Sequence, residues 1–263
     1  MAINAGLWPH RSLWFAFVRR ELQGRYLGSV GGVLWALLTP LLLLAIYGLV
    51  FRLIFRVTLP DLGEHDFIDF IAVALWPWLA FQEAVLKGLN AVQANAALVK
   101  KVAFPNELLV LSTVAATLLV HAVGYVLVLT ILSLLGHSFH AAGWVAAPVF
   151  FLAVGILATA VTLPLAALQV FLRDIEQFAS PLMMVVFYAT PILYPLSMAP
   201  DWLQSVIRLN PLTNLLQPLR ELLLTGHYDF GIAEIIVSAL LPILLLAGLA
   251  FFRRLAPHFE VTL

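Results

Sequence analysis

Few residues of this chain are of types that could do chemistry. Four carboxylates lie close together in sequence, at Asp61, Glu64, Asp66 and Asp69. Such a cluster is what a sugar transferase would need for acid and base catalysis. His121 is the other candidate, because an imidazole can carry a proton near neutral pH. What either feature can do depends on the elements around it.

Motifs for phosphate, metal and covalent chemistry are absent from the sequence. It has no G-x-x-x-x-G-K-[ST] phosphate loop, no H-E-x-x-H and no G-x-S-x-G, and its seven His are scattered. The lack of Cys excludes a thiolate metal site, a thiol nucleophile and a disulfide. A net charge of zero argues against a nucleic-acid partner. We expect no metal, no cofactor and no catalytic residue in this chain.

The elements that must position these residues are membrane spans. Residues 108–172 contain no Asp, Glu, Lys or Arg, and 63% of the whole chain is hydrophobic against 11% charged. At 1.5 Å per helical residue, that stretch is long enough for two crossings joined by a turn near residues 136–140. A water-soluble domain does not have this composition.

Apolar windows predict an all-α membrane protein with six transmembrane helices. They lie at 28–51, 67–86, 108–135, 144–168, 178–194 and 232–252. Residues 1–263 then form a single transmembrane domain, with a cytoplasmic amphipathic helix in 1–27, the spans in 28–252 and a cytoplasmic tail in 253–263. Within the second span, Glu83 and Lys87 are one turn apart and are expected to pair.

The distribution of Lys and Arg predicts that both termini are cytoplasmic, because cytoplasmic loops carry the excess of cations. The inner face would then hold Arg11, Arg19, Arg20, Arg25, Lys87, Lys100, Lys101, Arg173, Arg253 and Arg254. The outer face would keep only Arg52, Arg56, Arg208 and Arg220. The four clustered carboxylates fall in an outer connection, where acidic residues are ordinary, which makes a glycan-lipid transferase a less favoured alternative.

Residues 11–23 are predicted to form an amphipathic helix in the membrane interface. Its role is open between a surface anchor and a docking face for a cytoplasmic partner. Glu21 falls on the apolar side, so it should have a cationic partner, either Arg25 or a residue of another element. His121 is likewise open between a proton relay and a neutral side chain hydrogen-bonded to a neighbouring helix.

Two connections are unusual for loops. Residues 90–105 read as a short protruding helix that carries Asn95, Lys100 and Lys101 and is halted by Pro105. Residues 195–229 are too apolar for a solvated loop and contain four prolines, so they predict two short re-entrant or interfacial helices, a candidate outer gate.

In order along the chain, these pieces resemble the transmembrane subunits of ABC-2 type ABC exporters, in the branch that exports O-antigen, capsular polysaccharide or teichoic acid. The resemblance covers nearly the whole chain. Its most specific motif is Arg20-Glu21-Leu22, Arg25-Tyr26, Gly28-Ser29, Gly32, Trp35, Pro40 and Tyr47. Later motifs are Asn95, Leu98, Lys100-Lys101 and Phe104-Pro105, then Arg173-Asp174, Pro191-Ile192-Leu193-Tyr194 and Leu209-Asn210-Pro211-Leu212-Thr213. Thr190 departs from the Ser that many members have there.

The resemblance implies a homodimer in the bacterial cytoplasmic membrane, paired with two copies of a cytoplasmic ABC ATPase that binds ATP and Mg²⁺. The substrate would be a lipid-linked polysaccharide. ATPase coupling is then expected at Asn95, Leu98, Lys100, Lys101, Phe104 and Pro105, with the amphipathic-helix interface at Arg19, Arg20, Glu21 and Arg25. The channel is expected to be lined by Tyr26, Trp35, Tyr47, Phe187, Tyr188 and Tyr194, with an outer gate at Asn210 and Pro211.

Two further functions stay open at this point. An ABC-2 exporter of a small hydrophobic drug or lipid would also suit an apolar pathway with few charges. A passive channel or scaffold would need no ATPase.

Overall fold

The chain is helical over the residues described by its computed structural model, which are 8–26, 32–54 and 67–263, and no strand occurs in them. The longer helices are α1 (Arg11–Tyr26), α2 (Gly32–Leu49), α3 (Phe67–Gly88), α6 (Glu107–Leu134), α7 (Ala141–Phe171), α8 (Asp174–Tyr188), α10 (Pro211–Leu224) and α11 (Ile232–Leu255). The shorter elements are η1 (Trp8–His10), the π-helical η2 (Val50–Ile54), α4 (Ala91–Ala94), α5 (Ala96–Lys101), η4 (Leu196–Met198), α9 (Asp201–Ile207), η5 (Ala256–His258) and α12 (Phe259–Thr262). The predicted all-α class is confirmed.

Within the described residues, four helices are long and apolar enough to cross a membrane: α3, α6, α7 and α11. They coincide with the predicted second, third, fourth and sixth spans to within a few residues at each end. The first and fifth predicted spans correspond to α2 and α8, which have 18 and 15 residues. Residues 28–31 of the predicted first span lie outside the described residues.

The fifth predicted span has different ends in the structure. The helix begins at Asp174 rather than at 178, and it ends at Tyr188 rather than at 194. Pro191 explains the early end, because it has no N–H to donate and it disfavours the helical conformation of Thr190 before it. The chain turns there instead, with Ile192 N donating to Thr190 O at 2.7 Å.

The 90–105 segment is also different from its prediction. It forms two short helices, α4 and α5, rather than one, and the second ends at Lys101, before Pro105. The break falls at Asn95, whose backbone leaves the helical region at φ −112° and ψ 23°. Its side-chain Nδ2 donates to Ala91 O at 2.8 Å, which caps the end of α4.

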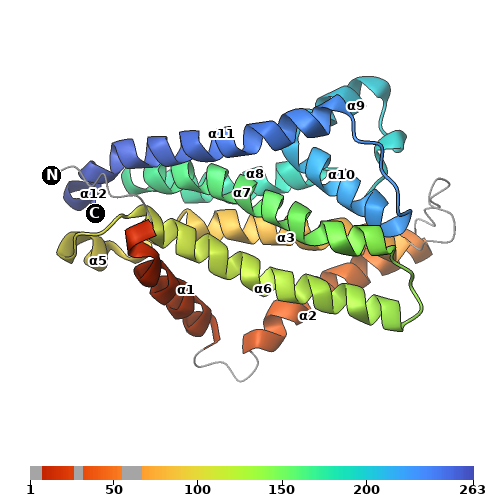
Figure 1. Cartoon of the computed structure of the whole chain (residues 1–263), viewed down its shortest axis with the longest axis horizontal. Helices are drawn as coiled ribbons and strands as arrows, with labels where there is room; N and C mark the ends of the chain where they lie inside the picture. Colours follow the sequence, from red (N-terminus) through yellow and green to blue (C-terminus); the bar gives the residue numbers. More distant parts are fainter. Residues whose placement is uncertain (1–7, 27–31, 55–66) are drawn as a thin grey trace.

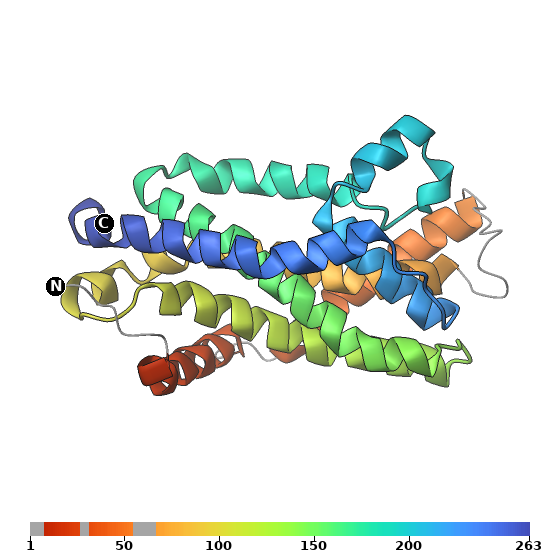
Figure 2. The same cartoon turned by 45° about the horizontal axis from the view of Figure 1, so that its top comes forward.

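Helix α3 lies at the centre of the bundle, and α2, α6, α7, α8 and α10 all contact it. Its residues from Phe70 to Trp78 are all buried. Helix α11 packs mainly along α7 and leaves many large apolar side chains exposed, such as Ile235, Ile243 and Leu246. Figures 1 and 2 show α5, α12 and the start of α6 at one end of the bundle, and α9 and α10 at the other. We call these the α5 end and the α9 end.

The long charge-free stretch folds as the predicted hairpin. Helices α6 and α7 pack against each other and are joined by a short turn. Gly136 lies in that turn with φ 100°, a conformation that side chains with a Cβ rarely adopt.

Candidate functional site

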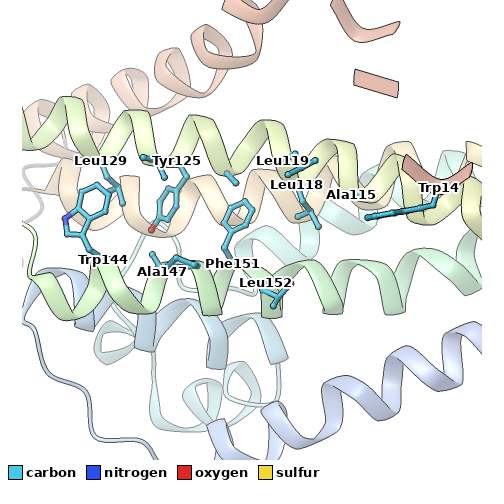
Figure 3. A pocket seen from close by; sticks show the side chains of 13 residues that line it. Trp14, Ala115, Leu118, Leu119, Tyr125, Leu129, Trp144, Ala147, Phe151 and Leu152 are labelled. Carbon is cyan, nitrogen blue, oxygen red and sulfur yellow. The ribbon is translucent and has the colours of Figure 1, made fainter. Parts of the chain in front are cut away.

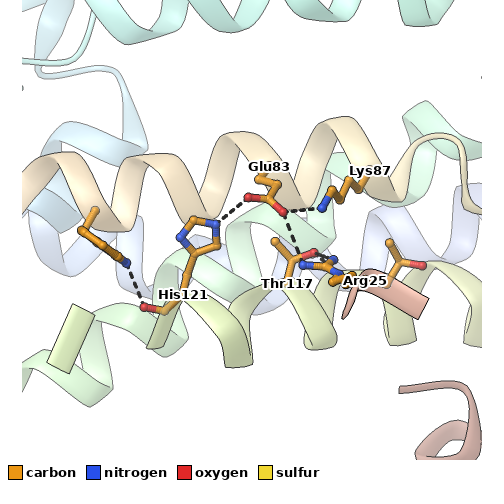
Figure 4. A network of polar contacts seen from close by, with 7 residues as sticks. Arg25, Glu83, Lys87, Thr117 and His121 are labelled. Carbon is orange, nitrogen blue, oxygen red and sulfur yellow. Dashed lines mark hydrogen bonds and ion pairs between the residues drawn. The ribbon is translucent and has the colours of Figure 1, made fainter. Parts of the chain in front are cut away.

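A network of charged and polar side chains lies between α1, α3 and α6 (Figure 4). Glu83 is its centre, and its two carboxylate oxygens accept from three helices. Lys87 Nζ lies 2.6 Å and Arg25 Nη1 3.3 Å from Oε1, and His121 Nε2 lies 2.8 Å from Oε2. Arg25 also donates through Nη2 to the Thr117 hydroxyl. The predicted pair of Glu83 and Lys87 is confirmed, within a larger cluster.

Burial makes this network important for the stability of the fold. The side chain of Arg25 is 12% exposed and that of His121 is 5% exposed, whereas Glu83 is 34% exposed. A buried charge is costly unless it is paired and hydrogen-bonded. The Glu83 carboxylate therefore compensates cations that α1 and α3 bring into the bundle.

His121 is hydrogen-bonded to Glu83 of the neighbouring helix α3, as its structural interpretation predicted. Its role as a proton relay stays a prediction. Because the Glu83 carboxylate accepts, Nε2 carries the proton of this hydrogen bond. Nδ1 is buried without a partner among the described residues. The backbone carbonyl of His121 accepts from Trp76 Nε1 at 3.0 Å, which adds a second tie between α6 and α3.

Helix α1 packs on α6 and faces the 90–105 segment. Phe17 and Val18 are buried, and the Phe17 ring meets Phe104 edge-on at 5.6 Å. On the polar side, Arg20 Nη2 donates to Asn95 Oδ1 at 2.6 Å. Among the described residues, Glu21 Oε1 pairs with Arg20 Nη2 at 3.8 Å, on the same helix, and not with Arg25 or another element as predicted. Arg25 instead contacts Glu83 of α3 and Thr117 of α6.

The 90–105 segment has a second attachment, to the junction between α7 and α8. Gln93 Nε2 donates to Gln169 O at 2.8 Å, and Asn90 Nδ2 donates to Glu176 Oε1 at 2.9 Å. Gln169 Oε1 in turn accepts from the backbone N of Glu176 at 3.0 Å. The segment is therefore hydrogen-bonded to α1 on one side and to the α7–α8 junction on the other.

The predicted coupling residues divide into an exposed group and a buried group. Lys100 and Lys101 are exposed, and so is Val102 after them. Phe104 and Pro105 are buried, and Leu98 is partly buried. The two lysines therefore offer a cationic surface, and the apolar residues hold it against the bundle.

Four of the predicted channel residues lie together where α2 meets α8. The rings of Tyr47 and Phe187 stack at 6.3 Å, and Phe187 also meets Tyr188 at 5.2 Å. Tyr194 Oη donates to Tyr188 O at 2.8 Å. Trp35, which is 58% exposed, lies three turns before Tyr47 on the same helix. Tyr26 ends α1, and its side chain lies outside the described part of the chain.

The predicted gate residues join α8 to α10. Asn210 Oδ1 accepts from Leu212 N at 3.0 Å and caps α10, with Pro211 in the first turn. Asn210 Nδ2 donates to the Thr190 hydroxyl at 2.8 Å. The 195–229 segment contains two α-helices, α9 and α10, as predicted. Their depth in the membrane stays a prediction.

The acidic cluster is represented in the structure by Asp69, since Asp61, Glu64 and Asp66 lie outside the described residues. Asp69 is buried at the start of α3, and its Oδ1 lies 2.7 Å from His137 Nδ1 of the α6–α7 turn. This position gives Asp69 a role in joining two elements. Over the described ranges, no three His, Asp or Glu side chains gather as metal ligands.

An apolar groove of about 420 Å³ lies between α6 and α7 (Figure 3). Trp14 and Trp144 stand at its two ends, and Leu118, Phe151 and Leu152 line it between them. Tyr125 also lines it, but its hydroxyl is already engaged with Val73 O at 3.0 Å. The groove suits hydrocarbon and has no free polar group to orient a sugar.

Sequence reasoning missed several polar residues that join elements. Thr117 and Gln169 were overlooked because they lie within the apolar spans, and Arg25 was assigned to the helix interface alone. Gln169 carried a signal, since an amide within an uncharged stretch of 65 residues needs a hydrogen-bond partner. The partners of Arg25 lie 58 and 92 residues away, so no local pattern identifies them.

Comparison with known proteins gives consistent matches over almost the whole chain. The profile of the family described as ABC-2 type transporter matches residues 12–224. An O-antigen export system permease protein RfbA of Klebsiella pneumoniae is 30% identical over 247 residues, 94% of this chain and 93% of its own length. The RfbA permease of Myxococcus xanthus is 35% identical over 80% of this chain and 79% of its own length. The polysialic acid transport protein KpsM of Escherichia coli is 25% identical over 90% of this chain and 91% of its own.

Proposed function

This chain belongs to the ABC-2 type transporter family, and on that premise we propose that it is the membrane-spanning subunit of an ATP-driven exporter for a lipid-linked polysaccharide of the O-antigen type. The observation that carries the proposal is the similarity to O-antigen export permeases along 94% of the chain. A polysialic acid transporter among the relatives supports a polysaccharide rather than a small molecule. The chain is a permease subunit and not an enzyme.

The location is the bacterial cytoplasmic membrane, which the chain crosses several times. We propose six crossings, with α2 and α8 adding to the four long apolar helices, and with both ends of the chain cytoplasmic. The location of α5 and α12 at one end of the bundle supports an even number of crossings between these two elements (Figure 1). The excess of Lys and Arg in the α5 end supports its cytoplasmic side.

The partners in this proposal are a second copy of the chain and two copies of an ABC ATPase. ATP and Mg²⁺ bind the ATPase, and this chain binds no cofactor. The exposed Lys100 and Lys101 supply a cationic docking surface, and the bonds of the 90–105 segment supply the connection to the spans. When the ATPase subunits close on ATP, they displace this segment. Its hydrogen bonds to α1, α7 and α8 then shift the helices that form the channel.

The aromatic group around Phe187 is the proposed channel wall. Tyr188 is 56% exposed, and Trp35 on α2 is also exposed, so both face outward toward a second copy of the chain. Aromatic faces bind sugar rings without the fixed polar contacts that would arrest a moving polymer. Asn210 and Thr190 join α8 to α10 beside this wall and are the proposed gate.

The test is deletion of the gene for this chain alone, followed by fractionation and surface labelling of the lipid-linked glycan. We expect the glycan to disappear from the cell surface and to accumulate inside, and the wild-type gene to restore export. Unchanged glycan in both locations would contradict the proposal. That result would favour the exporter of a small hydrophobic drug or lipid.

A further inference from the structure

A polar cavity of about 240 Å³ lies at the α9 end of the bundle. It is lined by side chains of α3, α9 and α10 and of the chain around Pro195. Its polar residues are Ser197, Gln204, Arg208, Gln217, Arg220 and Glu221. Two arginines and one glutamate leave the lining with a formal excess of one positive charge. A single water needs roughly 15 Å³ on this measure, so the cavity has room for a larger group.

Arg220 is the buried cation of this cavity. It is 5% exposed, its Nη2 donates to Ile192 O at 3.1 Å, and its guanidinium carbon lies 3.7 Å from the centre of the Phe70 ring. A carbonyl and an aromatic face are weak compensation for a full positive charge in the interior.

The hydrogen-bonding capacity of Arg220 is not used up within the described residues. Its Nε is buried and has no acceptor there. The ion pairs in that part of the chain do not include Arg220. Glu221, its neighbour in sequence, accepts from Gln217 Nε2 at 3.2 Å and is a nearby negative charge, but it makes no hydrogen bond to Arg220. An orphaned donor on a buried cation costs free energy unless a ligand or a water accepts from it.

We propose that this cavity binds a phosphate group, with Arg220 as its buried donor and the exposed Arg208 as a second cation. A guanidinium is a planar donor that matches phosphate oxygens, and charge-assisted bonds of this kind are strong. A phosphate also supplies the counter-charge that water cannot. The group can belong to the headgroup of a membrane lipid or to the carrier of a lipid-linked glycan, and the second source rests on the proposed function.

The test uses the purified full-length chain in a maltoside detergent and needs neither ATPase nor glycan. Inorganic diphosphate is titrated by calorimetry, and retention of phosphatidylglycerol is followed separately by native mass spectrometry. We expect Arg220→Gln to weaken whichever binding is present by about tenfold, since it removes a charge-assisted contact. Arg254→Gln, an exposed arginine at the α5 end, is the matched control and should leave binding unchanged.

The two probes distinguish the source of the phosphate. Binding of diphosphate indicates a soluble or carrier phosphate, and retention of phosphatidylglycerol alone indicates a lipid headgroup. If Arg220→Gln fails to fold, the Arg208→Gln variant tests the proposal, because the Arg208 side chain is exposed and its replacement should leave the fold intact. We expect Arg208→Gln to weaken binding of the probe by about threefold. The proposal is overturned if neither probe binds, or if every one of the two variants that folds binds as the wild type does. Export of glycan can persist in that case, so the proposed function would be judged separately.

Discussion

Glu83 and Arg220 are both charged residues within the helical bundle, and they are compensated in opposite ways. Glu83 is surrounded by Arg25, Lys87 and His121, each within hydrogen-bonding or ion-pair distance. Arg220 has a backbone carbonyl, an aromatic ring and an unused N–H. The difference shows that the first charge is committed to holding helices together, whereas the second is left able to accept a ligand.

The two ends of the molecule are joined by different contacts. Between α1, α3 and α6, ion pairs connect the amino-terminal helix to the spans, and Arg20 extends this connection to the 90–105 segment. At the α9 end, Asn210 caps α10 and donates to the Thr190 hydroxyl, and Asp69 pairs with His137 of the α6–α7 turn.

The largest effect should come from Glu83→Ala, because it leaves Arg25 in the bundle without its counter-charge. We expect the free energy of unfolding in mixed micelles to fall by about 2 kcal/mol, less than for a fully buried pair because the carboxylate is one-third exposed. Glu260→Ala, at the exposed carboxyl-terminal turn, is the control and should change it little. Equal effects of the two substitutions would refute the role given to Glu83.

Asn210→Ala should have the next largest effect. It removes the cap of α10 and the bond to Thr190, so we expect a loss of about 1 kcal/mol of stability. Asn210→Asp keeps the oxygen that accepts from Leu212 N but loses the donor to Thr190, and should lose less. The unfolding free energies of the two variants, measured side by side, check the order. Equal losses for the two variants would show that the bond to Thr190, which both lack, is the main contribution and the cap is not.

Arg220→Met should change the unfolding free energy much less than Glu83→Ala does. The apolar side chain removes a buried charge that has few compensating partners. The lost bond to Ile192 O and the lost contact with Phe70 offset that gain, so we expect a net change in unfolding free energy of below about 1 kcal/mol. The measurement is made without phosphate. A loss as large as that of Glu83→Ala would mean that Arg220 is a structural clamp and not a free donor.

The smallest effect on stability should come from Arg20→Ala, because the exposed hydrogen bond from Arg20 to Asn95 contributes only about 0.3 kcal/mol. Its effect should appear instead in the local dynamics of the 90–105 segment. We expect faster amide hydrogen exchange in α4 and α5, measured by mass spectrometry, because one of the two attachments is gone. Arg19→Ala, exposed on the same helix, is the control. Equal exchange in both variants would exclude the role of the bond to Asn95.

Much of the fold followed from the sequence because span position depends on local composition. The hairpin of α6 and α7, the long helices α3 and α11 and the pair of Glu83 and Lys87 are set by apolar length or by spacing along one helix. The end of α8 was wrong because the effect of Pro191 was overlooked. The break at Asn95 was missed because nothing in the pattern of residues 90–105 marks it.

The site was less predictable because its contacts join distant segments. The assignment of Arg20 and Asn95 to interacting elements came from a family resemblance, and their direct bond became known only from the structure. Arg220 was counted among the outer arginines by the span boundaries alone. Neither its burial nor its incomplete set of partners could be inferred, because both depend on how α10 packs against α3.

The most direct test of the whole account is to measure, in one strain, copurification of the ATPase and export of the glycan when Lys100→Glu is combined with Lys101→Glu. The matched control is Lys100→Arg with Lys101→Arg, which keeps the positive charge. The account predicts that charge reversal abolishes copurification and leaves the glycan inside the cell, while the control behaves as wild type. If the reversed variant retains both ATPase association and export, the coupling role of the 90–105 segment is wrong.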